Sequence, residues 1–175
     1  MTTAASASAS WAAAWPDLAW QCRRFDALEL RELHYIYMAR QKVFAIEQQC
    51  AYLDADGFDE HAFHLAAWSS AQSEPLAYAR LLDPGTKYAR DASIGRVITT
   101  AVARRCGLGR ELMRRAIEEA RSAWPLAAVR ISAQTRLEPF YCGFGFVAVG
   151  LPYLEDGIDH TEMVLGEAAA AERNL

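Results

Sequence analysis

The sequence lacks the features that would place it in several common protein classes. It has no apolar run near the roughly 20 residues that a membrane-spanning helix needs. Its N-terminal region has no basic segment followed by an apolar one, as a secretory signal would. The formal net charge of -4 gives no reason to expect nucleic acid or a membrane as a partner. The cysteines form no Cys-x-x-Cys pair, which argues against a zinc site and fits a reducing, cytoplasmic location.

The length and composition predict one globular domain with short tails. The chain has 175 residues, of which 53% are hydrophobic and 23% charged, as in ordinary soluble proteins. Residues 1–17 are rich in Ala, Ser and Thr, so we expect a disordered N-terminal tail there. Residues 18–167 should form the domain, and residues 168–175 a C-terminal tail.

The segment from Ser93 to Trp124 has the clearest local pattern. β-branched apolar residues predict a buried strand over Ser93–Thr99. A turn with Gly107 and Gly109 follows, and a helix begins near Leu108. Apolar residues recur along that helix at the spacing of one buried face: Leu108, Leu112, Met113, Ala116, Ile117, Ala120 and Trp124.

The glycine-bearing turn predicts a site for an anion. The first N–H groups of a helix have no intrahelical partners, and glycines let a ligand approach them. The helix dipole and the charges of Arg104, Arg105 and Arg110 favour phosphate there. Two known phosphate loops are excluded, because Gly109 is not followed by Lys-Ser/Thr and no third glycine stands at position 112. An ordinary turn with solvated arginines is the alternative.

The other elements are predicted from periodicity and turn residues. Asp26 has the position of an N-cap for a helix over Ala27–Val43, with Leu30 among its core residues. A short helix is expected over Leu137–Phe144. Further strands are expected at Trp20–Phe25, His64–Trp68, Leu76–Leu82, Val129–Ala133, Phe146–Val149 and His160–Leu165.

Two blocks of sequence resemble one protein family. Arg104-x-x-Gly107-x-Gly109 resembles the Arg/Gln-x-x-Gly-x-Gly/Ala signature of the GNAT superfamily of N-acetyltransferases. Phe140-Tyr141-Cys142-Gly143-Phe144-Gly145-Phe146 resembles the Phe-Tyr-x-x-x-Gly-Phe segment after the fifth strand of that superfamily. Val43-Phe44-x-x-Glu47-Gln48-x-Cys50-x-Tyr52 and Tyr153-x-Glu155-Asp156-Gly157-Ile158-x-His160 look like its ElaA-type branch.

The resemblance implies a fold and a cosubstrate. The fold is α/β, with a mixed, mostly antiparallel sheet of about six to seven strands, flanking helices, and a splay between strands 4 and 5. Acetyl-coenzyme A would bind with its pyrophosphate on the amides of Arg104, Arg105, Cys106, Gly107, Leu108, Gly109 and Arg110. Backbone amides of Val97, Ile98 and Thr99 would bind the pantetheine and polarise the thioester carbonyl.

The implied reaction is acetyl transfer to a primary amine by direct attack on the thioester. Tyr141 would protonate the leaving thiolate, although a packed tyrosine with a structural hydroxyl is the alternative. Candidate bases are Glu47, Asp56, Asp59, His64, Glu155, Asp156 and His160, each of which is individually compatible with a solvated or structural role. Together they predict an acidic pocket for a cationic amine.

Metal binding is not expected, although Asp54-x-Asp56-Gly57-x-Asp59 superficially resembles a calcium loop. Its glycine is at the fourth position rather than the sixth, and no twelfth-position glutamate follows. A coenzyme A-binding sensor or scaffold without transferase activity is the alternative to an enzyme. The sequence leaves the acceptor and the oligomeric state open, with a homodimer as one candidate state.

Overall fold

The fold is a single mixed sheet between layers of helices. The structure, a computed structural model, describes residues 10–166. Its strand order is β1-β2-β3-β4-β5-β8-β6, and β7 pairs with β8. All pairs are antiparallel except β4–β5. The strands are β1 Ala19–Arg24, β2 Ala62–Trp68, β3 Ala77–Leu82, β4 Ala92–Thr99, β5 Val129–Gln134, β6 Val147–Ala148, β7 Tyr153–Glu155 and β8 Ile158–Leu165.

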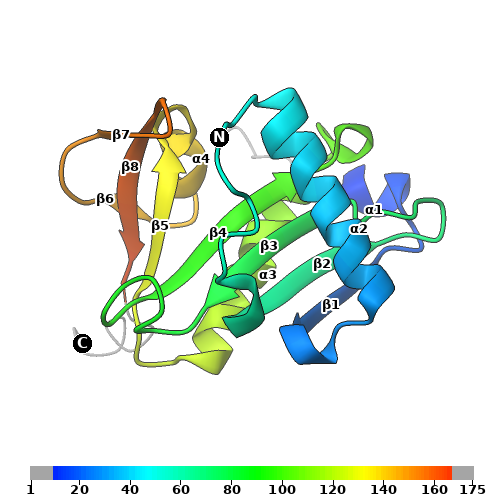
Figure 1. Cartoon of the computed structure of the whole chain (residues 1–175), viewed down its shortest axis with the longest axis horizontal. Coiled ribbons are helices and arrows are strands. Elements are labelled where there is room, and N and C mark those ends of the chain that lie inside the picture. The colour runs from blue at the N-terminus through cyan, green and yellow to red at the C-terminus, as the bar shows by residue number, and fades with distance from the viewer. Residues whose placement is uncertain (1–9, 167–175) are drawn as a thin grey trace, which may run out of the picture.

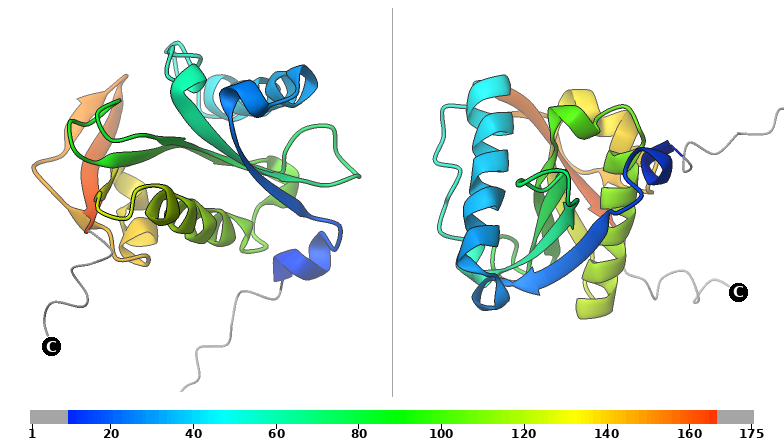
Figure 2. Two further views of the ribbon diagram at one scale, coloured as in Figure 1. Left: turned by 90° about the horizontal axis from the view of Figure 1, so that it is seen from below. Right: turned by 90° about the vertical axis from the view of Figure 1, so that its right-hand side faces the viewer.

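Helices cover both faces of this sheet (Figures 1 and 2). Helix α2 lies on one face, and α3 lies on the other with α4. The helices are α1 Ser10–Ala14, α2 Leu30–Gln41, α3 Leu108–Ala123 and α4 Glu138–Cys142. A π-helical segment, Lys42–Glu47, extends α2, and short 3-10 turns span Phe25–Ala27, Asp59–His61, Ala101–Ala103 and Thr135–Leu137. None of the helices within residues 10–166 is long and apolar enough to cross a membrane.

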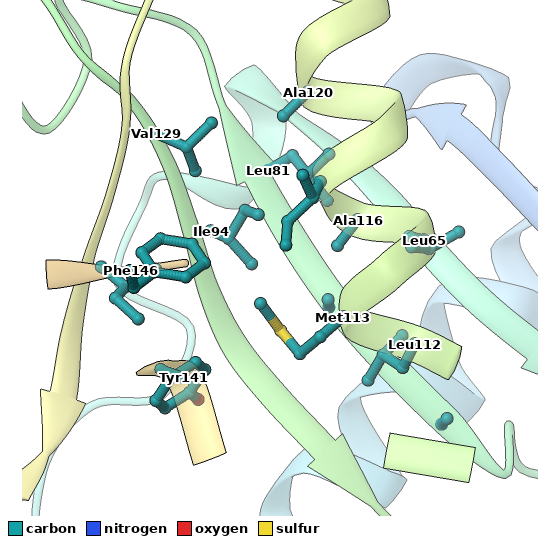
Figure 3. Packing of buried hydrophobic residues seen from close by; sticks show 14 of the residues in the cluster. Leu65, Leu81, Ile94, Leu112, Met113, Ala116, Ala120, Val129, Tyr141 and Phe146 are labelled. Carbon is teal, nitrogen blue, oxygen red and sulfur yellow. The ribbon is translucent and has the colours of Figure 1, made fainter. Parts of the chain in front are cut away.

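The predicted α/β fold with a mixed, mostly antiparallel sheet is confirmed. Residues 10–166 form eight strands rather than six to seven, because the sequence pattern did not separate β7 from the loop before β8. Every apolar residue predicted for the α3 face is buried except Trp124, which is partly buried. Figure 3 shows Leu112, Met113, Ala116 and Ala120 of α3 directed at the sheet.

The predicted start of α2 is wrong by one turn. Phe25–Ala27 forms a 3-10 turn, and α2 begins at Leu30. The backbone N–H of Glu29 donates to the Glu32 carboxylate at 2.9 Å. Glu29 is therefore the N-cap of α2, the position predicted for Asp26. Because Leu30 is now the first helical residue, its side chain is 85% exposed instead of buried in the core.

The predicted N-terminal tail is wrong for residues 10–17. Residues 10–14 form α1, and Trp11 and Trp15 pack against the core on the α3 face. The Asp17 carboxylate accepts hydrogen bonds from the Ser69 and Ser70 hydroxyls at 2.9 and 2.5 Å. The rest of the predicted tail, residues 1–9, and the predicted C-terminal tail from residue 168 lie outside the described residues.

Strands β4 and β5 separate soon after they meet. Their parallel pairing consists of Ala92 opposite Val129 and Ser93 opposite Arg130. Beyond Ser93 the two strands diverge, as Figure 1 shows, so the β5 side of β4 has no strand partner there. This splay, which was predicted, opens the sheet in the middle of the molecule.

Candidate active site

A cavity of about 380 Å³ lies in the splay between β4 and β5. Gly95, Arg96 and Val97 of β4 line one side, and Ile131 and Ser132 of β5 line the other. The remaining lining comes from the π-helical segment and the loop after it, from β3 and the loop after it, from further residues of β4 and β5, from α4 and the turn before it, and from the β7–β8 hairpin: Phe44, Gln48, Cys50, Tyr52, Leu53, Asp56, Phe58, Arg80, Lys87, Ile94, Gln134, Leu137, Tyr141, Glu155, Asp156, Ile158 and His160. The cavity therefore joins segments that are far apart in sequence.

Strand β4 carries a bulge where it borders this cavity. Tyr78 pairs with Ile98 and Arg80 with Gly95, so two steps along β3 face three steps along β4. Arg96 takes up the difference with a φ of +52°, in the left-handed region that side chains other than glycine rarely adopt. A bulge breaks the regular ladder and turns backbone groups out of it.

The predicted anion loop is built as the glycine pattern requires. Gly107 precedes α3 with a φ of +86°, a conformation that glycine adopts without strain. A Cβ added to Gly109 would meet only Thr99 Cγ2, at 3.7 Å. Arg104, Arg105 and Arg110 are all exposed residues around the loop, and Leu108 is buried in the core. Cys106 is partly buried, and its thiol donates to the Ala103 carbonyl at 3.1 Å.

Strand β4 connects this loop to the cavity. Arg104 Nε donates to the Thr99 carbonyl at 3.0 Å, while Val97, two residues before Thr99, lines the cavity. Between them, Ile98 turns its side chain into the opposite face of the sheet, where it is 3% exposed. An elongated ligand could lie along β4 with an anionic group on the loop and its other end in the cavity.

Tyr141 lies where this path enters the splay (Figure 3). Its ring packs edge-on against Phe140 and Phe146, with centroids 5.1 and 6.1 Å away. The side chain lines the cavity although the residue is only 7% exposed. Burial raises the pKa of Tyr141 to about 12, so its hydroxyl is protonated throughout the physiological range.

Three arginines and three aspartates form a network beneath the loop that follows the π-helical segment. We call Arg40, Arg80, Arg96, Asp54, Asp56 and Asp59 the Arg–Asp network. Arg40 Nη1 lies 2.7 Å from Asp59, and its Nε 2.8 Å from Asp54. Arg80 binds both oxygens of Asp56 at 2.6 and 2.7 Å and reaches Asp59 at 3.1 Å. Arg96 Nη2 also lies 2.9 Å from Asp56.

The network corrects the prediction of an acidic pocket. Asp59 is 4% exposed and does not line the cavity, and Asp56 meets the cavity only as the partner of two arginines. Glu47 is also outside the lining, because its carboxylate pairs with Arg104 of the anion loop. His64 is buried away from the site, between the Tyr78 hydroxyl and the Asp59 carbonyl. Of the predicted acids, only Glu155 and Asp156 give the cavity unneutralised charge.

A second polar cluster at the β7–β8 end includes Ser132 of β5, which the sequence pattern did not single out. Ser132 donates to the Glu155 carboxylate at 2.8 Å and lies 2.6 Å from the Tyr153 hydroxyl. His160 Nδ1 lies 2.9 Å from the Ile158 carbonyl. A carbonyl oxygen can only accept, so Nδ1 carries the hydrogen and Nε2 of the neutral ring keeps its lone pair. Tyr153 begins the sequence motif that ends at His160, whereas no signal in the sequence linked Ser132 to this cluster.

The Arg–Asp network should make the protein sensitive to acid. Burial alone would raise the pKa of Asp56, but the hydrogen bonds and charge of Arg80, together with Arg96, lower it to about 2. A lowered carboxyl pKa gives stability that is complete above the unfolded value of about 3.9 and is lost as the pH falls toward 2. We expect the free energy of unfolding to fall by about 2 kcal/mol over that window from Asp56 alone.

Urea denaturation at a series of pH values measures this loss. Asp56→Asn should be less stable than the wild type at pH 7 and lose less stability between pH 5 and pH 2. Asp159→Asn, the same change at an exposed aspartate of β8, should follow the wild type. Parallel curves for Asp56→Asn and the wild type would show that the network does not set the acid limit.

Within residues 10–166, no three His, Cys, Asp or Glu side chains are grouped so that they could hold a metal ion. In the loop from Asp54 to Asp59, the closely spaced carboxylates that resemble a calcium loop bind arginine side chains. Its closely spaced carboxylates serve three guanidinium groups that come from α2, β3 and β4.

Sequence comparison identifies relatives along most of the chain. A family model described as an acetyltransferase (GNAT) domain matches residues 38–166. Protein ElaA of Escherichia coli is 36% identical over 146 residues, which are 82% of this chain and 94% of ElaA. A UPF0039 protein of Synechocystis is 39% identical over 148 residues, which are 85% of this chain and 95% of that protein.

Comparison with solved structures identifies the same kind of relative. The crystal structure of an acyl-CoA N-acyltransferase from Pseudomonas aeruginosa has a TM-score of 0.79 and 42% identity, and covers 84% of this chain and 98% of that one. The crystal structure of Escherichia coli ElaA has a TM-score of 0.77 and 34% identity, with the same coverage of both chains. With the splayed sheet and the glycine loop in place, the chain belongs to the GNAT family of acyltransferases, in its ElaA-like branch.

Proposed function

We propose that the chain transfers an acetyl group from acetyl-coenzyme A to a primary amine in the cytoplasm. The observation that carries this proposal is the cavity in the β4–β5 splay, where Tyr141 and the pair Glu155 and His160 line one space bordered by the β4 bulge. The exposed arginines and glycines of the loop from Arg104 to Arg110 suit the pyrophosphate, as the dipole of α3 does.

Each part of the proposed reaction has a residue to serve it. The amine nitrogen bonds to the carbonyl carbon while the carbon–sulfur bond breaks, and the thiolate takes the Tyr141 proton. Backbone amides on the open side of β4 would stabilise the negative charge that develops on the carbonyl oxygen. The proton lost by the amine goes to His160 Nε2, directly or through water, because that nitrogen keeps its lone pair.

Glu155 and Asp156 support a cationic acceptor rather than an anionic one. Both line the cavity, and neither is paired with an arginine or lysine among the described residues. Opposite charge lowers the desolvation cost of bringing an ammonium group into the cleft. Lys87 also lines the cavity and would disfavour a second positive charge near it. We therefore propose a primary amine with a single positive charge, such as a lysine side chain or an N-terminal amine, as the acceptor class.

A thiol-release screen with acetyl-coenzyme A against amines, peptides and aminoglycosides tests the proposal. Primary amines should turn over, at rates that rise with pH as the free amine is exposed. Turnover of anionic or neutral acceptors alone would contradict the amine assignment. Binding of acetyl-coenzyme A without turnover of any amine would instead support a coenzyme A-binding sensor.

Replacing Glu155 with glutamine should separate acceptor binding from cosubstrate binding. The change removes the charge and keeps the shape, so we expect the KM for the amine to rise by about tenfold. The KM for acetyl-coenzyme A should stay within about twofold of the wild-type value, because Glu155 is expected to face the acceptor rather than the cosubstrate. Steady-state kinetics with each substrate varied measure both constants, with Asp159→Asn as the exposed control. Equal changes in the two constants would show that Glu155 does not face the acceptor.

A further inference from the structure

The bulge of β4 is held in an unfavourable backbone conformation beside the cavity. Arg96 has a φ of +52°, and only a few per cent of residues other than glycine adopt positive φ values. Gly95, Arg96 and Val97 all line the cavity, on the stretch of β4 that has lost its β5 partner. An unfavourable conformation persists only where surrounding contacts fix it.

The contacts that fix this bulge come from the Arg96 side chain. Its Nε lies 2.8 Å from Asp54 Oδ1, and its Nη2 lies 2.9 Å from Asp56 Oδ2. Nη2 also donates to the Asp54 carbonyl at 3.2 Å. The guanidinium carbon stands 5.1 Å from the centre of the Tyr52 ring. The side chain is only 19% exposed, so solvent weakens these ion pairs little.

The two aspartates are themselves fixed from the rest of the fold. Asp54 is bound by Arg40 of α2 at 2.8 Å, and Asp56 by Arg80 of β3 at 2.6 Å. Arg40 is fully buried and Arg80 is 3% exposed. Arg96 is therefore anchored to α2 and β3 through partners that cannot easily move, which is the arrangement a rigid support needs.

We propose that Arg96 is a positioning residue for acyl transfer. Its pairing with Asp54 and Asp56 holds the β4 bulge so that a backbone amide of the bulge faces the thioester carbonyl in the cavity. This inference rests on the proposed function, because it assigns the bulge to the carbonyl that the acceptor attacks. The guanidinium itself touches neither substrate in this role and acts through the backbone.

Alanine and glycine at position 96 distinguish this role from a general structural one. Both substitutions remove the guanidinium and both ion pairs. Glycine adopts positive φ freely, so Arg96→Gly can keep the bulge, whereas Arg96→Ala retains the strain without the contacts that oppose it. If Arg96 serves only to neutralise the aspartates, the two variants should behave alike.

Calorimetry gives a readout that does not depend on turnover. The affinity for acetyl-coenzyme A divided by the affinity for coenzyme A reports contacts to the acetyl group alone. In Arg96→Ala we expect this ratio to fall by about fivefold, and kcat by about tenfold, since the bulge relaxes. In Arg96→Gly both quantities should lie within about threefold of the wild type. Asp54→Asn should lower the ratio in the same direction as Arg96→Ala and covers the case in which that variant does not fold.

The outcomes separate this inference from the proposed function. Equal ratios in the Ala and Gly variants, or a wild-type ratio in Arg96→Ala and Asp54→Asn, would overturn the positioning role. If the wild type binds acetyl-coenzyme A but acetylates no amine, the proposed function fails while the affinity ratio still tests the bulge. If the wild type binds acetyl-coenzyme A and coenzyme A with equal affinity, the proposed contact between the bulge and the acetyl group is overturned.

Discussion

Replacing Tyr141 with phenylalanine should lower kcat by about ten- to a thousandfold and leave the affinity for acetyl-coenzyme A nearly unchanged. The substitution keeps the ring, whose contact with the buried Phe146 packs α4 against the core. It removes only the hydroxyl, which the pKa of about 12 keeps protonated and able to donate. The loss should therefore appear in the chemical step rather than in binding or stability.

The pH profile and a second tyrosine make this prediction specific. The contribution of Tyr141 should persist through neutral pH and decline only as the pH approaches 12. Tyr35→Phe removes a hydroxyl on α2, outside the cavity, and it should leave kcat unchanged. A Tyr141→Phe enzyme as fast as the wild type at every pH would assign the residue to packing, with solvent as the proton source.

Those elements with strong periodicity could be predicted from the sequence. The strand ending at Thr99 and the helix beginning at Leu108 were predicted almost to the residue, because each buries one regular face. The start of α2 was misplaced because Asp26 and Glu29 both stand where an acidic residue could begin a helix. Only the tertiary position of the 3-10 turn at Phe25–Ala27 decides between them.

The candidate site could be predicted in part, and mainly by resemblance. The glycine loop and Tyr141 were found because short motifs mark them, although their roles stay predictions. The negative charge of the cavity was overestimated, because counting carboxylates ignores the arginines that other elements bring to Asp56 and Asp59. One signal was available: Arg80 stands within the otherwise apolar strand Ala77–Leu82, and a buried arginine requires acidic partners.

Replacing Gly107 with glutamate should reduce the affinity for acetyl-coenzyme A by about a hundredfold or more, roughly the loss of two hydrogen bonds to a charged group. Gly107 stands just before α3, where the pyrophosphate should lie against the first amides of the helix. A side chain there would occupy the approach, and its negative charge would repel the phosphates. The same charge is favourable at a helix N-terminus, so it should not weaken α3 itself.

Glutamine at position 107 is the matched control for charge. It has nearly the shape of glutamate and suffers the same strain at a φ of +86°, so both variants should lose similar thermal stability without ligand. Acetyl-coenzyme A at a concentration that saturates the wild type should raise the melting temperature of the wild type most. It should raise the melting temperature of Gly107→Gln less and leave that of Gly107→Glu nearly unchanged. Greater salt should narrow the gap between the two variants, because it screens the repulsion. A folded Gly107→Glu protein that binds acetyl-coenzyme A as well as the wild type would place the pyrophosphate elsewhere, and the loop from Arg104 to Arg110 would be an ordinary turn.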